Sequence, residues 1–407
     1  MLNQHFSTRN FMRLMNTRDV YKYSMGNDRE GYAQVLSGVE ERLLDPEYAF
    51  ARFKRHSLPH GDVISPGNIV DDFALRKLND NVKRVFNVRT ADRNRILPQI
   101  KILLSEEGEF WIQKLDVSRF FESIPKELAF NLALEDSRLS FESKRCLQKL
   151  LNSPSIQVVT GLPRGISLSS TLSELYMKSF DEHCRRLEGC YFYVRYVDDI
   201  FMMFYEDPGD LMKVLALPEG LSFNIKKCIK MHKRLKGPVV SSDSSSGISY
   251  LGYHFDFKSL GKDKPCKLEV GVSEKKIKKI KTRVCRALFE YCRTLNFALL
   301  KRRLIFLASN YDVGKDSEKG RLFAGVYFNN HLLDRQRFRD LEGIDKFIQC
   351  CVFSRSGSLG RALAGKLNQN QRRELCRISL MHGFQEKVVR KFSPEELLEI
   401  KGAWAHV

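Results

Sequence analysis

The sequence predicts an α+β fold, in which an antiparallel sheet with packed helices is flanked by helical regions. Three observations support this prediction. Between residues 110 and about 257, short runs rich in aromatic and β-branched residues alternate with helical stretches. Residues 1–105 are mostly helical in character. Apolar residues at helical spacing return beyond residue 270.

The composition indicates a globular protein with a polyanionic partner. The chain has 407 residues, enough for two or three domains. It carries 68 Lys and Arg against 49 Asp and Glu, a formal net charge of +19, so nucleic acid is the first candidate partner. The ten cysteines offer no zinc-ligand spacing and are expected to be reduced thiols. Neither a signal peptide nor a membrane span is evident, so we expect a cytoplasmic location and no membrane partner.

Each segment has its own sequence signature. Residues 1–105 contain a turn-like break at HSLPHGDVISPGN (56–68). The following elements are then expected in chain order: a strand in FWIQKLDV (110–117), a helical stretch over 126–151, a β-type run in SIQVVTGLP (155–163), a helix over about 168–187, and a hairpin in YFYVRYVDDIFMMF (191–204). In SEKKIKKIKTRVCRALFEY (273–291) one apolar stripe can pack, while the surrounding Lys and Arg side chains face phosphate or solvent.

Two aspartates in the hairpin form the first candidate site. Asp198 and Asp199 lie at a turn between two apolar runs, where ionised carboxylates are stable only when paired or bound to metal. Asp116 likewise ends an apolar strand, and two such strands side by side would bring Asp116 and Asp198 together. Mg²⁺ prefers hard oxygen ligands and phosphates, so the pair suggests a two-metal phosphoryl-transfer site. Taken alone, two solvated turn aspartates would be the simpler explanation.

Five segments in order resemble a known family. The segments KLDVSRFFESI, TGLPRGISLSS, RYVDDIF, FNIKKC and ISYLGYHF stand in the order and approximate spacing of the palm motifs of reverse transcriptases. The resemblance covers residues from about 85 to 257. It implies a right-hand polymerase with fingers, palm and helical thumb, plus a helical C-terminal extension. The expected division is 1–105 for the N-terminal helical region and fingers, 106–257 for the palm with a fingers segment at about 125–165, 270–330 for the thumb, and 331–407 for the extension.

The flanking regions look most like bacterial reverse transcriptases linked to phage defence, of the retron, abortive-infection and unknown-group lineages. Within these, the chain is similar to the smaller enzyme of defence systems that encode two reverse transcriptases. This resemblance implies an RNA template, in particular a dedicated noncoding RNA, together with dNTPs and a DNA product. A second reverse transcriptase or a second copy of the chain is a further expected partner.

The resemblance also implies roles for the matching residues. Asp116 and Asp198 would hold two Mg²⁺ ions, with Mn²⁺ as a substitute, helped by the Val117 carbonyl and supported by Asp199. Phe121 is at the steric-gate position, where an aromatic ring would crowd a 2′-hydroxyl and select dNTPs.

Other matching residues would contact nucleotide and primer. Gly165 lies in a tight turn that lets backbone approach the nucleotide, although Arg164 stands where the family often has Gln. Lys227, with Lys226 as a rival, would protonate the pyrophosphate leaving group. Leu251 and Gly252 match the primer-grip turn, and a plain buried hairpin explains them almost as well. Arg89 and Arg93 are the candidates for triphosphate binding, and a surface helix with arginines is the alternative.

Two other functions stay open at this stage. One is a template-independent or protein-primed nucleotidyltransferase on the same palm. The other is a non-catalytic RNA-binding scaffold built on a polymerase fold. The presence of all three aspartates favours an enzyme, an RNA-directed DNA polymerase, because loss of activity usually removes metal ligands first.

Overall fold

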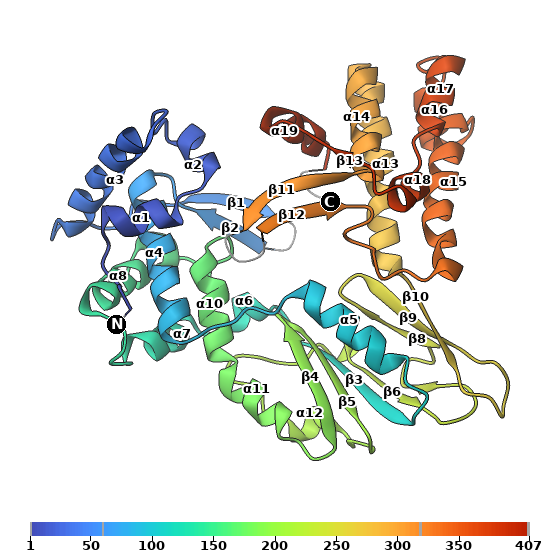
Figure 1. Cartoon of the computed structure of the whole chain (residues 1–407), viewed down its shortest axis with the longest axis horizontal. Helices are drawn as coiled ribbons and strands as arrows, with labels where there is room; N and C mark the ends of the chain where they lie inside the picture. The colour runs from blue at the N-terminus through green and yellow to red at the C-terminus, as the bar shows by residue number, and fades with distance from the viewer. Residues whose placement is uncertain (1, 59–60, 317–319, 405–407) are drawn as a thin grey trace. The chain divides into compact units, whose positions relative to one another are not determined.

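The protein, seen here as a computed structural model, is described over residues 2–58, 61–316 and 320–404 and consists of two compact units (Figure 1). The first unit contains Met1–Asp92 and Phe110–His232, and the second contains Arg93–Glu109 and Lys233–Val407. Both units are therefore discontinuous in sequence. The α+β fold predicted from the sequence is confirmed.

The first unit combines helices with the main sheet. Its helices are α1 (Thr8–Leu14), α2 (Thr17–Lys22), α3 (Arg29–Leu44), α4 (Ile69–Val85), α6 (Phe120–Ser123), α7 (Lys126–Leu134), α8 (Phe141–Leu151), α9 (Pro154–Gln157), α10 (Ser167–Tyr176), α11 (Lys178–Arg185) and α12 (Leu211–Val214). Its strands are β1 (Lys54–Leu58), β2 (Gly61–Ser65), β3 (Phe110–Asp116), β4 (Cys190–Tyr196), β5 (Asp199–Phe204) and β6 (Ile229–Lys233).

The strands of the main sheet that belong to the first unit have the order β4-β5-β3-β6. Strand β5 is antiparallel to both β4 and β3, so it lies between two segments that are far apart in sequence. Its residues Ile200–Phe204 are all buried, which explains the nearly continuous apolar run in the sequence. This central position fixes the turn before β5 at the edge of the sheet where β3 ends.

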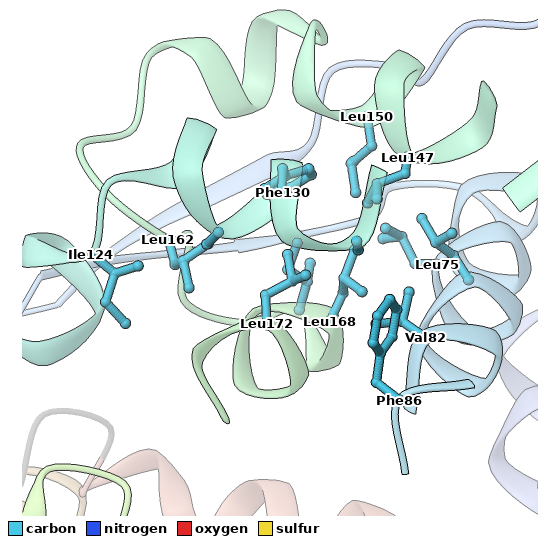
Figure 2. Packing of buried hydrophobic residues seen from close by; sticks show 14 of the residues in the cluster. Leu75, Val82, Phe86, Ile124, Phe130, Leu147, Leu150, Leu162, Leu168 and Leu172 are labelled. Carbon is cyan, nitrogen blue, oxygen red and sulfur yellow. The ribbon is translucent and has the colours of Figure 1, made fainter. Parts of the chain in front are cut away.

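Helices α4, α7, α8 and α10 pack around a common hydrophobic core (Figure 2). Side chains from all four helices meet there, including Leu75, Val82, Phe130, Leu147 and Leu168. Helix α4 has clear end signals, because the Asn68 side chain accepts a hydrogen bond from the Asp71 amide, and basic residues occupy the last turn. This core supports the helices that border the sheet.

The second unit contains two smaller sheets and the remaining helices. Its strands are β7 (Val240–Ser241), β8 (Gly247–Tyr250), β9 (Tyr253–Lys258), β10 (Lys267–Val272), β11 (Asn310–Asp316), β12 (Gly320–Gly325) and β13 (Val389–Arg390), with sheet orders β10-β9-β8 and β12-β11-β13. Its helices are α5 (Arg93–Leu104), α13 (Glu274–Thr294), α14 (Phe297–Ala308), α15 (Arg339–Phe353), α16 (Gly357–Leu363), α17 (Gln369–Cys376), α18 (Leu380–Gln385) and α19 (Pro394–Gly402).

Several local expectations differ from the structure. The segment SIQVVTGLP contains no strand: it holds the end of α9 and a turn, because the Lys126 ammonium donates hydrogen bonds to the carbonyls of Ile156, Gln157 and Val159 (2.9–3.0 Å). The region beyond residue 270 is not purely helical, since β11 and β12 form a hairpin within it. The break at 56–68 includes the antiparallel pair β1–β2. The four-part division into fingers, palm, thumb and extension stays a prediction.

No helix in the described part of the chain is both long and apolar enough to cross a membrane.

Candidate active site

The turn between β4 and β5 presents the first candidate carboxylate. Tyr196 pairs with Asp199, so the hairpin is closed by only Val197 and Asp198. Val197 has φ +59°, a left-handed conformation that β-branched residues rarely adopt. Such strain persists only where the surrounding structure imposes it. Here the turn is imposed by two well-paired strands, and it places Asp198 beyond the end of the sheet.

Strand β3 brings the second carboxylate to the same edge. Asp116, the last residue of β3, stands opposite Asp199 in the antiparallel register. The Val117 amide donates a hydrogen bond to the Asp198 carbonyl (3.0 Å), which ties the two motifs together directly. The Asn224 amide donates to the Asp116 carbonyl (2.7 Å). The structure thus brings Asp116, Asp198 and Asp199 together across more than eighty intervening residues.

The local electrostatics are those of crowded carboxylates with few cations. Burial raises the pKa of Asp198, and the charge of Asp116 adds to the increase. Burial also raises the pKa of Asp199, although Lys114 lies 3.9 Å away and opposes the shift. The Lys227 ammonium contacts both Asp116 carboxylate oxygens (3.0 and 3.1 Å). Its burial would lower its pKa, but the bonds to Asp116 outweigh this and raise the pKa.

Asp116 and Asp198 border a cleft of about 910 Å³. Its lining includes Asp116, Val117, Arg119, Phe121, Glu122, Arg164, Gly165, Asp198, Asn224 and Lys227. Phe121 therefore borders the same space as the carboxylates, and Phe120 beside it lines the cleft too but is otherwise buried in the core. The backbone of Phe121 is fixed by the Leu162 amide, which donates to its carbonyl (2.8 Å). Residues from the predicted motifs thus surround one cleft, which can accept a nucleotide-sized ligand.

Gly165 lies where two backbones approach closely. Its φ is +100°, and an added Cβ would lie 2.2 Å from the Ile64 carbonyl oxygen. The Ile64 amide donates a hydrogen bond to the Arg164 carbonyl (2.8 Å), so β2 runs directly alongside this turn. Any larger residue at position 165 would push the β1–β2 hairpin away from the cleft. Contact with a nucleotide stays a prediction for Gly165.

The predicted triphosphate ligands lie elsewhere. Arg89 lines a separate cavity of about 270 Å³ together with Glu174, Asp181 and Glu182, and this cavity shares no lining residue with the cleft. Arg93 belongs to the second unit, where its Nε donates to the Leu251 carbonyl (2.9 Å) and its guanidinium stacks over the Tyr253 ring. The triphosphate role of both arginines stays a prediction.

The predicted primer-grip residues form the turn between β8 and β9. Tyr250 pairs with Tyr253, so Leu251 and Gly252 close the hairpin, and Leu251 has φ +44°. The turn lies in the second unit, and its contact with a primer stays a prediction.

The donor set fits a hard divalent cation. Across the described residues, no three His, Cys, Asp or Glu side chains converge closely enough to hold a metal by themselves. Mg²⁺, however, usually keeps several waters and takes only one or two carboxylates together with substrate phosphates. The charge of Asp116 makes ionisation of Asp198 less favourable, and a cation between the two carboxylates would remove this repulsion.

Sequence reasoning missed a buried cation behind the hairpin. Arg195 on β4 has a side chain that is only 2% exposed, and its guanidinium contacts Glu174 and Asp181 (2.7 Å each). It also donates to the Val197 carbonyl (3.0 Å), so it anchors the turn that carries Asp198. A charged residue within an otherwise apolar strand was the available signal.

A second missed feature lies in the cleft itself. Arg164 pairs with Glu122 (Nε to Oε1, 2.7 Å), so the two motifs that carry Phe121 and Gly165 are joined by an ion pair. The sequence signal for this ion pair was Arg164 itself, which stands where the family often has Gln.

An antiparallel sheet that presents carboxylates at the edge of a cleft lined by cationic and aromatic side chains as well is the arrangement of a polymerase palm. Residues 69–255 match the sequence model of the family described as reverse transcriptase (RNA-dependent DNA polymerase). Residues 69–255 of the chain thus form a reverse transcriptase domain. Among curated proteins, none matches the sequence.

Solved structures of telomerases from two Candida species are similar at low identity. Apo telomerase from Candida tropicalis, truncated from the C-terminal domain, is 11% identical, with TM-score 0.34 over 56% of each chain. Telomerase from Candida albicans with a TWJ fragment of telomeric RNA is 12% identical, with TM-score 0.33 over 82% of this chain and 53% of that one. The Candida tropicalis complex with the same kind of fragment is 12% identical, with TM-score 0.33 over 94% and 70%. This chain spans about half the length of the first two telomerase chains.

Proposed function

We propose that this protein is a reverse transcriptase that adds dNTPs to a primer 3′ end on an RNA template. The observation that carries the proposal is the register of β3 and β5, which places Asp116 opposite Asp199 and next to the Asp198 turn at one cleft. The reverse transcriptase domain over residues 69–255 supports the choice of template and product.

Each residue at the cleft has a part in this reaction. Asp116 and Asp198 would hold two Mg²⁺ ions with the help of the Val117 carbonyl, and Asp199 would support them. The ions supply charge stabilisation for the attacking and leaving oxygens of the in-line displacement. Lys227 is protonated at Nζ, because its bonds to Asp116 raise its pKa, and pyrophosphate can take this proton as it leaves. Phe121 would crowd a 2′-hydroxyl and exclude ribonucleotides.

The thumb role proposed for α13 fits its charge distribution. Val284, Leu288 and Tyr291 are buried, whereas five cations on the helix are exposed: Lys275, Lys278, Lys279, Arg286 and Arg293. Such a face can contact phosphates of a template–primer duplex, and its contribution to affinity should fall steeply with salt.

We also propose a cytoplasmic enzyme that copies a dedicated noncoding RNA in antiphage defence, alone or with a second reverse transcriptase or a second copy of the chain. The support is the resemblance of the flanking sequence to defence-associated lineages. The alternatives are template-independent or protein-primed nucleotide addition and a non-catalytic RNA-binding scaffold.

One assay separates these functions. The full chain is incubated with labelled dNTPs, Mg²⁺ and a DNA primer annealed to RNA, and then with each component omitted. We expect a product that requires the RNA template and that Asp198→Ala abolishes, whereas Asp136→Ala, at a half-buried carboxylate that does not line the cleft, retains activity. Product without template would support untemplated addition, and no product with intact RNA binding would support the scaffold. Phe121→Val should admit rNTPs while keeping dNTP incorporation.

A further inference from the structure

The cleft contains a cation that the structure leaves without an acidic partner. Three basic side chains line it, namely Arg119, Arg164 and Lys227. Lys227 contacts Asp116, and Arg164 pairs with Glu122. Arg119 is exposed and forms no ion pair or side-chain hydrogen bond with any residue in the described ranges 2–58, 61–316 and 320–404. Its guanidinium is therefore available to an anion that enters the cleft.

The backbone at Arg119 is held in an unfavourable conformation. Its φ is +41° and its ψ is +49°, the left-handed region, which costs a side-chain-bearing residue about 1–2 kcal/mol. Contacts on both sides impose this geometry: the Ser118 amide donates to the Ser222 carbonyl (2.9 Å), and the Ser123 amide donates to the Arg119 carbonyl (2.9 Å). Glycine would occupy the position at lower cost. Strain of this kind clusters at ligand sites, where it forms part of the site.

We infer that Arg119 binds the triphosphate of the incoming nucleotide. The inference rests on the proposed polymerase function and names the cation for its substrate. Arg119 follows Asp116 by three residues and borders the same cleft as Asp198. A guanidinium presents a fixed fork of donors that matches phosphate oxygens in a bidentate manner. The anion expected next to two metal-binding carboxylates is the phosphate chain of a nucleotide.

The lining of the cleft also explains why Arg119 is preferred over Arg89 and Arg93, the triphosphate ligands predicted from the sequence. Arg89 lines a separate cavity, which shares no lining residue with the cleft. Arg93 already donates to the Leu251 carbonyl in the second unit. Neither residue lines the cleft around Asp116.

Two glycine variants test the assignment. Arg119→Gly removes the guanidinium and relieves the backbone. Lys387→Gly is the matched control, because Lys387 is another exposed cation with a left-handed backbone (φ +50°) and lies in the second unit. Calorimetric binding of a non-hydrolysable dNTP and of the corresponding monophosphate is measured in Mg²⁺ for the full chain and both variants, together with Tm. Arg119→Lys is added as the conservative variant.

The expected result is selective. Arg119→Gly should weaken triphosphate binding roughly 10- to 100-fold, the range for hydrogen bonds between charged groups, and should leave monophosphate binding unchanged. Arg119→Lys should recover part of the loss. Neither glycine variant should lower Tm, and Lys387→Gly should bind both nucleotides as the wild type does.

Other outcomes overturn the inference. These are unchanged triphosphate affinity in Arg119→Gly, an equal loss for the monophosphate, or no triphosphate binding by the wild type. If Arg119→Gly polymerises normally while Asp198→Ala is inactive, the polymerase function stands and only this assignment fails. If triphosphate binding depends on Arg119 but no templated product forms, the assignment stands and the proposed reaction fails.

Discussion

Replacing Arg195 with methionine should destabilise the first unit strongly. The Arg195 guanidinium contacts Glu174 and Asp181 at 2.7 Å and donates to the Val197 carbonyl at 3.0 Å. The two acidic side chains are only 16% and 12% exposed. Without Arg195 they would be buried charges with no counterion. Breaking such a buried pair costs about 3–5 kcal/mol of unfolding free energy.

The control is a surface pair of the same chemistry. Arg138 contacts Asp136 at 2.7 Å, but its side chain is 62% exposed. Exposed ion pairs contribute at most about 1 kcal/mol. Arg138→Met should therefore change the unfolding free energy much less than Arg195→Met does, although both variants remove one guanidinium from the first unit.

The assay must report on the first unit alone, because a chain with two compact units need not unfold in one step. The chain has two tryptophans, Trp111 on β3 and Trp404 in the second unit. In a Trp404→Phe background, Trp111 fluorescence during urea unfolding follows the sheet that contains Arg195.

A loss below about 1 kcal/mol for Arg195→Met would refute the reasoning, since it would equal the surface case. A further variant tests the cause. If uncompensated charge is responsible, adding Glu174→Gln and Asp181→Asn to Arg195→Met should restore part of the lost stability. If the lost contact to Val197 dominates, the added substitutions should give no recovery.

Two further predictions concern pH. Burial and the charge of Asp116 raise the pKa of Asp198, so its ionised form costs stability, and this cost disappears as pH falls through the raised pKa. Asp198→Asn should therefore raise Tm at pH 8 without metal and lose this advantage toward pH 4. At Asp136, bonds from Arg138 lower the pKa to about 2, so Asp136→Asn should instead destabilise the protein at pH 8. Burial and Arg93 lower the pKa of Lys276 to about 7. As pH falls from 10 to 7, the unfolded chain binds a proton at this lysine that the folded chain does not, so the wild type loses stability. Lys276→Met should gain stability relative to wild type over that interval, as followed by Trp404 fluorescence, and a constant difference would contradict the assignment.

The acidic centre of the site could be predicted because its determinants are local. An apolar strand that ends in Asp116 and a tight hairpin turn that holds Asp198 fix where the two carboxylates lie, and the apolar runs of β3 and β5 favour their register. The order of five motifs adds the cleft residues Phe121 and Lys227. Patterns within short segments, taken in their order along the chain, are enough to place these residues.

Features that depend on contacts between distant segments could not be predicted. The residues after α9 look β-like, but three carbonyls converge on Lys126, which the local pattern does not reveal. Which of Arg89, Arg93 and Arg119 lines the cleft depends on the path of the folded backbone, and the sequence around each arginine does not reveal that path. Arg195 was missed because the pairing of a buried cation is visible only once α10 and α11 are in place.

The membership of α5 in the second unit has a consequence for synthesis. Residues Arg93–Glu109 belong with a unit whose remaining residues begin at Lys233, so α5 leaves the ribosome more than a hundred residues before its packing partners exist. At about 5–20 residues per second, it waits several seconds at least. During that time its apolar face, formed by Ile96, Leu97, Ile100 and Leu104, has no native surface to cover it. During synthesis the nascent chain therefore exposes the apolar face of α5 until the rest of the second unit has been translated. The yield of active protein should depend on translation speed and on chaperones that bind such helices.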